Sequence, residues 1–406
     1  MRRIFAVRDI LGHAVIAIVG LPLLAGCGPS ETAAAARWSG TLDTLPSGVV
    51  AVHNPGDPVW SESDRWRVEE ELRIGSLEGT GPDVFGQINT MEVDGAGRLW
   101  VLESQAQELR VFDAAGEHVR TIGRQGGGPG EFAQAVRVEQ SPQGHMWVMD
   151  PQNNRISVFD TAGEYLEAKP AAGGFIMIPW PGRFDDKGNY YAPVPRPGRE
   201  RFSIGMVRYD AALSPTDTLD TPTDPVERER FELTNSTGGF IWAGVPYQGS
   251  LMWRLSPWGT IWAMLTDEYR LFELSPEGDT LRSITRAFTP LPVTPEDREQ
   301  ARENMKWFTD QGGRIDLSKL PATKPAASSF FFDDERNLWV EKVTASGVEN
   351  ASYDVFDSVG RFLGTIDLPI PLSSNPQPIV RDGVLYGVTR DELEVPYVVR
   401  ARIVKP

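Results

Sequence analysis

Residues 120–132 read RTIGRQGGGPGEF, with five glycines among the eight residues 123–130. Glycine-rich loops in front of a helix often bind phosphate through backbone N–H groups. This loop lacks the Lys-Ser or Lys-Thr pair of a P-loop, and no helix is predicted after it. The sequence therefore argues against a nucleotide site here.

The same pattern begins 47 residues earlier in the chain. Residues 72–88 (LRIGSLEGTGPDVFGQI) align with residues 119–135 (VRTIGRQGGGPGEFAQA), and the following segments keep the same spacing. Weaker copies of the unit occupy 185–213, 256–278, 333–360 and 380–404. Each copy has a turn, an aromatic-rich strand and a further strand, bounded by Gly, Asp and Asn. Six such units of about 40–50 residues predict an all-β, six-bladed β-propeller over residues 66–406.

The second unit carries a family resemblance. Its pattern I-G, G-x-G-P-G-E-F, W-V and N-x-R-I-x-V-F-D between 120 and 160 resembles the NHL-type repeat of six-bladed propellers. The likeness extends in outline over residues 66–404. It implies the propeller fold, but a fold does not by itself fix a function.

The ends of the repeat region predict how the ring closes. The last unit has room for three strands only, and residues 65–74 (RWRVEEELRI) precede the first complete unit. We expect this segment to pair with residues 396–404, because the pairing leaves no open sheet edge. Residues 46–65 are expected to form an extension packed on the propeller, with a short strand at 49–52.

The N-terminus has the features of an export signal. Three arginines among the first eight residues precede an apolar run from Ile10 to Leu24, and small residues follow it. The run of about 15 residues is shorter than the roughly 20 that a membrane-spanning helix needs. Residues 1–26 are therefore predicted to be a signal peptide and residues 27–45 a flexible tether.

The motif Leu24-Ala25-Gly26-Cys27 resembles the lipobox of bacterial lipoproteins. The resemblance implies that Cys27, the only cysteine, becomes a lipidated N-terminus. Gly28 follows it, which by the same resemblance favours sorting to the outer membrane. We expect an exported protein that is lipid-anchored at the cell envelope and contacts the membrane through Cys27 alone.

The charge of the chain limits its partners. Cleavage after residue 26 removes three arginines and one aspartate, so the formal net charge changes from −16 to −18. Such an acidic protein repels nucleic acid, which we exclude as a partner. We expect a monomer.

Three insertions depart from the repeat spacing: 196–201, 222–250 and 290–325. All three map to the loops that open on one face of a propeller, which we call the top face. In the last insertion, Thr294 and Pro295 predict a helix start, and Ala301, Met305 and Phe308 form an apolar stripe before Gly312. This helix is expected to lie over the ring, either gating a site or only plugging the funnel.

Ligand-binding candidates are polar or aromatic residues predicted on the top face or in the channel: Arg124, Gln125, Arg137, Arg199, Trp242 and Tyr247. Arg137 is also expected to pair with Glu139 inside the channel. Trp242 and Tyr247 would either stack on a sugar ring or planar ligand, or pack within their own loop. The predicted function is a non-catalytic propeller that binds a small molecule, glycan or protein.

An enzyme is the alternative. A calcium-dependent hydrolase that resembles lactonase or gluconolactonase propellers needs oxygen ligands around the channel, and the candidates are Asn89, Glu103, Asp150 and Asn154. Asp150 and Asn154 also occupy a repeat turn, where Asp and Asn cap loops for structural reasons. No catalytic residue is assigned, and no cofactor is expected other than calcium in this alternative. The histidines of the folded part (His53, His118 and His145) are too scattered in the predicted register for a zinc site.

Overall fold

In blades one and five, the turn between the first two strands explains the Asp and Trp spacing of the repeat. In the computed structural model, the Asp94 carboxylate accepts a hydrogen bond from Trp100 Nε1 at 2.9 Å, six residues later. Asp333 and Trp339 repeat this contact at 3.0 Å. Both tryptophans are buried, so the turn fixes a large core side chain at the start of the second strand of its blade.

The structure describes residues 37–170, 183–196, 203–234, 238–348 and 350–406. Trp38–Pro406 form one compact unit that contains six antiparallel blades. Blade one contains β4 (Ile88–Val93), β5 (Leu99–Glu103), β6 (Glu108–Phe112) and β7 (His118–Ile122). Blade two contains β8 (Arg137–Gln140), β9 (Met146–Asp150), β10 (Arg155–Phe159) and β11 (Tyr165–Pro170). Blade three contains β12 (Arg183–Phe184), β13 (Tyr190–Arg196), β14 (Ser203–Tyr209) and β15 (Pro215–Asp220).

The second half repeats the arrangement. Blade four contains β18 (Leu251–Leu255), β19 (Ile261–Leu265), β20 (Arg270–Leu274) and β21 (Thr280–Arg286). Blade five contains β22 (Ala327–Phe332), β23 (Leu338–Lys342), β24 (Ser352–Phe356) and β25 (Phe362–Asp367). Blade six contains β26 (Ile379–Arg381), β27 (Val384–Arg390), β28 (Pro396–Val404) and β3 (Arg67–Ile74).

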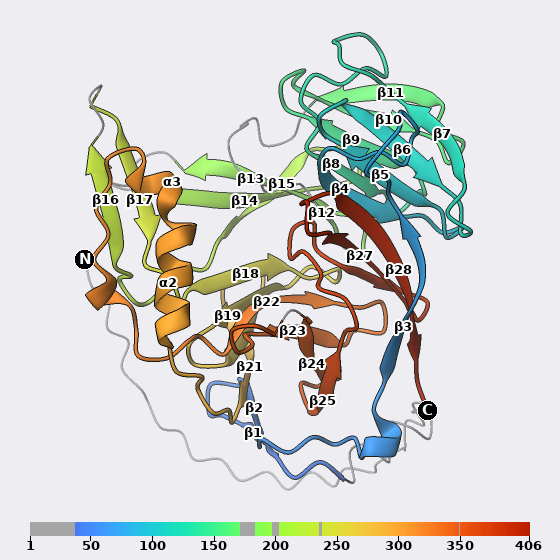
Figure 1. The fold of residues 1–406 in the computed structure, drawn as a ribbon. Helices are drawn as coiled ribbons and strands as arrows, with labels where there is room; N and C mark the ends of the chain where they lie inside the picture. Colours follow the sequence, from blue (N-terminus) through green and yellow to red (C-terminus); the bar gives the residue numbers. More distant parts are fainter. Residues whose placement is uncertain (1–36, 171–182, 197–202, 235–237, 349) are drawn as a thin grey trace, which may run out of the picture. The chain divides into compact units, whose positions relative to one another are not determined.

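The ring closes as the sequence predicts. β3 pairs antiparallel with β28, from Val398 opposite Ile74 to Val404 opposite Arg67 (Figure 1). β3 therefore supplies the fourth strand of the blade whose first three strands are the last three of the chain, and the six-bladed fold is confirmed.

The segment before β3 runs along the outer strands of neighbouring blades. β2 (Val50–Asn54) pairs parallel with β21 of blade four, and β1 (Thr41–Thr44) pairs with β2. The backbone N–H groups of Val59 and Trp60 then donate to β25 of blade five, before the short 3-10 helix η1 (Glu62–Asp64). β1 lies within residues 27–45, which were expected to form a flexible tether. Its pairing with β2 gives Thr41–Thr44 a regular structure.

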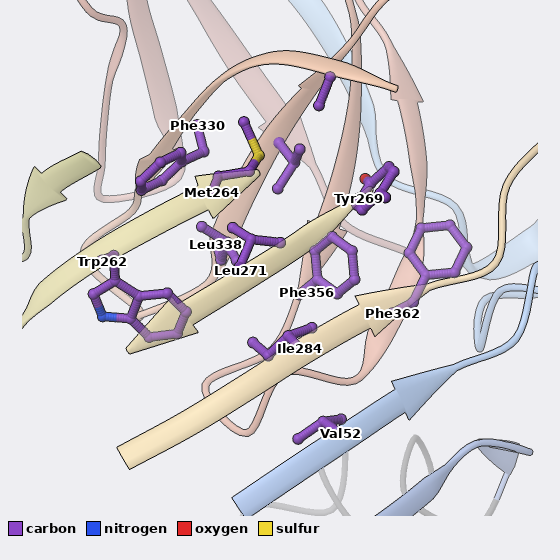
Figure 2. Packing of buried hydrophobic residues seen from close by; sticks show 12 residues of the cluster. Val52, Trp262, Met264, Tyr269, Leu271, Ile284, Phe330, Leu338, Phe356 and Phe362 are labelled. Atoms are coloured by element: carbon purple, nitrogen blue, oxygen red, sulfur yellow. The ribbon is translucent and has the colours of Figure 1, made fainter. Parts of the chain in front are cut away.

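Buried side chains fill the spaces between blades. Between blades four and five, Trp262, Met264 and Leu271 pack against Phe330 and Phe356 (Figure 2). Val52 of β2 joins the same cluster. Alternating apolar residues on each strand therefore pack one blade on the next, as the repeat pattern requires.

Two insertions form a separate small core on the propeller, which we call the top-face module. It contains the hairpin β16 (Arg230–Thr234) and β17 (Phe240–Gly244), the helices α2 (Pro295–Asn304) and α3 (Lys306–Thr309), and the short 3-10 helix η2 (Leu317–Lys319) (Figure 1). Thr294 caps α2 as predicted. The stripe of Ala301, Met305 and Phe308 is buried against Phe231 and Ala243 of the hairpin.

The predicted single helix is interrupted. α2 ends at Asn304, because Met305 leaves helical geometry with φ −94° and ψ 4°, and α3 follows. The interruption keeps both Met305 and Phe308 in the core that the helices share with the hairpin.

Candidate functional site

The glycine-rich loop is occupied by contacts of its own. Arg124 Nη2 lies 2.7 Å from Glu131 Oε1, and Gln125 Nε2 donates to the Ala133 carbonyl at 3.2 Å. Arg155 donates to the carbonyls of Gly127, Gly128 and Glu131. Arg124 remains largely exposed, but the loop presents its carbonyl groups to protein side chains.

One glycine of this loop has a clear steric reason. Gly123 has φ +81°, and a Cβ atom there would lie 2.3 Å from the ring of Phe132. Phe132 is fully buried and packs against Phe159. The loop thus turns the chain sharply and delivers an aromatic side chain to the core.

The two carboxylates proposed as metal ligands bind backbone N–H groups. Glu103 accepts from Gly86, Gln87 and Ala106 at 2.6–3.1 Å. Asp150, 47 residues later, accepts from Ala133 at 2.8 Å and Gln134 at 3.0 Å, and from the Asn153 side chain at 2.7 Å. Each carboxylate therefore fastens the incoming loop of its own blade, which is the structural role of a polar residue at this repeat position.

The two amides proposed with them are placed differently. Asn89 accepts from Gln87 Nε2 at 3.2 Å, beside a bulge in β4. Asn154 is exposed in a turn with φ +51°. Within the described ranges, no three His, Cys, Asp or Glu side chains come together as a metal-binding group. The four predicted ligands are engaged in their own turns or exposed.

The top-face module leaves aromatic side chains in solvent. Phe240 is 80% exposed and Trp242 is 65% exposed, on the face of the hairpin that points away from the buried stripe. Glu232 lies directly opposite Trp242 in the strand register, and Arg230 Nε is 2.5 Å from Glu232 Oε1. We call these four residues the aromatic platform.

Tyr247 does not belong to this platform. It packs with the inner cluster of the module, and its hydroxyl donates to the Asp297 carbonyl at 3.1 Å. Lys324 Nζ lies 5.5 Å from the centre of its ring. The sequence grouped Trp242 with Tyr247, but the structure places them on opposite sides of the hairpin core.

A buried ion pair fixes the module to blade five. Lys324 Nζ lies 2.7 Å from Asp297 Oδ1 and donates to Ser346 Oγ at 3.0 Å, and both charged side chains are almost fully buried. Ser346 belongs to the loop between β23 and β24, and it also donates to Asp297. Burial opposes ionisation of Asp297, but hydrogen bonds from Lys324, Ser346 and Thr294 hold its pKa well below the usual range. We call Asp297, Lys324 and Ser346 the clamp.

A further cluster of charged side chains lies in the channel, and the sequence predicted only one pair of it. Arg137 Nε lies 3.3 Å from Glu139 Oε2, as predicted for this pair. Arg183 of β12 and Arg254 of β18 come close enough to influence the same charges. We call Arg137, Arg183 and Arg254 the arginine hub.

Sequence reasoning missed Phe240, Arg183 and Arg254 as site residues. A signal for the last two exists, because both lie two residues before the first turn of their blade, where blades one and two carry Glu92 and Glu139. Arg199 and Cys27 lie outside the described residues.

None of the helices in the described ranges has the length and apolar character needed to span a membrane. A protein-family model described as a 6-bladed β-propeller matches residues 76–171. No curated protein sequence matches the chain.

Solved structures are similar in fold. One is from Bacteroides fragilis and is described as a candidate exported protein; the TM-score is 0.50 at 12% identity, covering 87% of this chain and 100% of that chain. Others are an inactive variant of virginiamycin B lyase from Staphylococcus aureus (TM-score 0.41, 11% identity, covering 84% and 100%) and a gluconolactonase from Xanthomonas campestris (TM-score 0.36, 13% identity, covering 79% and 88%). At these identities the likenesses concern the fold alone. The sheet order and the family match together show that this chain is a six-bladed β-propeller with a helical insertion on its top face.

Proposed function

We propose that the protein is a non-catalytic, glycan-binding protein of the cell envelope and that the aromatic platform is its binding surface. The observation that carries this proposal is the exposure of Phe240 and Trp242 on a hairpin whose other face packs against α2 and α3. Large apolar side chains exposed together on a fixed surface are typical of a binding site.

The platform has the chemistry that a sugar requires. A pyranose ring offers an apolar face of C–H groups, which stacks on an aromatic ring, and a rim of hydroxyl groups. Glu232 beside Trp242 supplies hydrogen-bond acceptors, and Arg230 supplies donors. The aromatic side chains therefore match the C–H face of a sugar, and the charged side chains match its hydroxyl groups.

The size and charge of the surface favour a neutral glycan over a protein. The outer face of two five-residue strands covers on the order of 200 Å², whereas each partner in a stable protein complex buries about 800 Å². The strongly acidic chain also disfavours anionic polysaccharides.

The clamp supports this function by fixing the hairpin. Asp297 and Lys324 tie α2 to blade five, and α2 and α3 pack on the hairpin through Ala301 and Phe308, respectively. A platform held rigidly before binding loses less entropy when a ligand binds.

Envelope location is part of the proposal. The apolar N-terminal run and the lipobox-like motif at Cys27 support export followed by lipid anchoring. The description of the Bacteroides fragilis structure as a candidate exported protein agrees with export. Lipid attachment at Cys27 would hold the propeller near the envelope glycans that it is proposed to bind.

The test is affinity electrophoresis of the folded part, from residue 37 onward, against a panel of neutral polysaccharides, followed by calorimetry with oligosaccharides of any that bind. We expect Trp242→Ala to weaken binding at least about tenfold, because a stacking contact that buries most of an indole ring contributes more than about 1.4 kcal/mol. Leu393→Ala is the matched control, because Leu393 is 68% exposed on another loop.

Failure of every neutral glycan to retard the wild-type protein contradicts the proposal. Equal binding by wild type and Trp242→Ala contradicts the assignment of the platform. We do not propose the hydrolase, because the carboxylates of Glu103 and Asp150 already accept hydrogen bonds from backbone N–H groups.

A further inference from the structure

Four charged side chains occupy one repeated position around the channel. Glu92, Glu139, Arg183 and Arg254 each lie two residues before the first turn of blades one to four. Their strands β4, β8, β12 and β18 are the first strands at the edges of their sheets, and β4 contacts β8 of the next blade. The repeat therefore brings two acidic and two basic residues to one level of the channel.

Among the described residues, the two acidic side chains are in ion pairs and the two basic side chains are not. Glu139 contacts Arg137 at 3.3 Å and accepts from the Phe184 N–H at 2.7 Å. Glu92 lies 3.6 Å from Arg381 Nη2. In the described part of the chain, neither Arg183 nor Arg254 has a carboxylate within ion-pair distance. Among the described residues, these two guanidinium groups therefore lack a direct counter-charge.

Arg254 has a buried donor atom that makes no hydrogen bond. Its Nη2 donates to Ser329 Oγ at 3.2 Å, and its guanidinium lies 5.7 Å from the centre of the Phe330 ring. Its Nε is buried without a hydrogen-bond partner. Burial, followed by the positive charges of Arg183 and Arg137, lowers the pKa of Arg254 to about 10. The arginines of the hub therefore destabilise one another.

Blade five has two further buried polar atoms without partners, on the face of its sheet that points away from blade four. Glu341 lies opposite Ser329 and Tyr353 in the strand register. Glu341 Oε2 and the Tyr353 hydroxyl are buried without partners, and Tyr353 is only 1% exposed. Each such atom costs about 1–3 kcal/mol when nothing satisfies it. Burial also raises the pKa of Glu341, which favours its neutral, donating form.

We propose that the arginine hub binds the carboxylate or phosphate group of a small ligand between Arg183 and Arg254. Arg254 Nε supplies a donor that no described protein atom uses, and Arg183 supplies the second positive charge. Guanidinium groups match the geometry of both oxyanions. This site is separate from the aromatic platform and does not depend on the proposed glycan function.

The proposed site must attract an anion although the chain as a whole is negatively charged. A net charge of −16 repels anions in general, so attraction must come from the hub itself. The site is therefore expected to take compact ligands that fit between the blades and to reject extended polyanions.

The experiment is thermal unfolding of the folded part in sodium phosphate, sodium acetate and sodium chloride at constant ionic strength. Phosphate or acetate, at about ten times its dissociation constant, is expected to raise the melting temperature by about 2–4 °C over chloride. A shift with phosphate alone identifies a phosphate site, and a shift with acetate alone identifies a carboxylate site. Equal melting temperatures in all three salts contradict the proposal.

Substitutions in the arginine hub test the assignment of the site more directly. Arg254→Met is expected to abolish the anion-dependent shift and to leave the anion-free protein at least as stable, because a repulsive charge is removed. Arg183→Gln should also abolish the shift, whereas Glu139→Gln should increase it. Arg124→Gln, at an exposed arginine paired with Glu131, should keep the full shift. A wild-type shift that persists in Arg254→Met and Arg183→Gln overturns the assignment. Glycan binding by the platform should be unchanged in both hub variants.

Discussion

The blade turns and the top-face module differ in the burial of their polar and aromatic side chains. In blade two, Asp150 is fully buried and its carboxylate is saturated by hydrogen bonds from the neighbouring loop. In the module, Trp242 and Phe240 are exposed and contact no core. A side chain that the fold already uses is a poor candidate for a ligand contact, so the comparison moves the binding surface from the turns to the module.

The largest expected effect comes from separating the two regions at the clamp. Asp297→Ala leaves the buried ammonium of Lys324 without its partner, which costs about 3–5 kcal/mol. Because the clamp joins only the module to blade five, we expect local release of α2 rather than unfolding of the ring. Limited proteolysis should cut within residues 222–250 or 290–325 and leave the blades intact.

The double variant Asp297→Leu/Lys324→Met is the control, because removing both charges restores much of the stability that one unpaired charge costs. Cleavage of the single and double variants at equal rates would contradict the role of the ion pair.

The same ion pair predicts a pH dependence. The folded-state pKa of Asp297 lies below its unfolded value of about 3.9, so its contribution is complete only above about pH 5 and is lost as the pH falls from there through the folded pKa. Proteolysis with an acid-active protease between pH 5 and pH 2 should show the module loosening in the wild type. Asp297→Asn should lack this pH-dependent component. A wild-type cleavage rate that matches Asp297→Asn across this range would contradict the linkage.

The fold could be predicted from the sequence because the same pattern of strands and turns recurs several times along the chain. The 47-residue spacing between 72–88 and 119–135 established the unit, and the missing fourth strand of the last unit identified residues 65–74 as its closure. Helix α2 was also predicted, because Thr294 and Pro295 are strong local start signals. Local signals did not show that the helix breaks at Met305, since packing against the hairpin decides that position.

The candidate site was less accessible to sequence reasoning. Asp150 and Glu103 have the right chemistry for a metal, and only their hydrogen bonds show that the chemistry is already used. Trp242 and Tyr247 are five residues apart, but Trp242 is exposed on β17, whereas Tyr247 lies in the turn after β17 and packs with the inner cluster. Sequence spacing cannot assign these faces, because the hairpin lies outside the repeat register.

A smaller effect is expected in the blade turn itself. Asp150→Ala removes the acceptor for three backbone N–H groups and the Asn153 side-chain amide, which costs about 2–4 kcal/mol in urea unfolding. Asp150→Asn retains one acceptor oxygen and should lose about half as much. If calcium raises the melting temperature of the wild type but not of Asp150→Asn, the carboxylate is a metal ligand after all and the comparison fails.

The smallest effect on stability should come from the platform. The double variant Phe240→Ser/Trp242→Ser is expected to change the free energy of unfolding by no more than about 0.5 kcal/mol, because neither side chain is buried. Phe308→Ala, in the buried stripe of the same module, should cost about 3–5 kcal/mol. Urea unfolding of both variants measures the difference. It is followed by circular dichroism rather than by tryptophan fluorescence, because one variant lacks a tryptophan. Two exposed aromatic residues that contribute nothing to folding yet are essential for glycan binding would give the contrast between blade and module its functional meaning. A loss of stability in the double variant close to that of Phe308→Ala would instead show that the platform is part of the core.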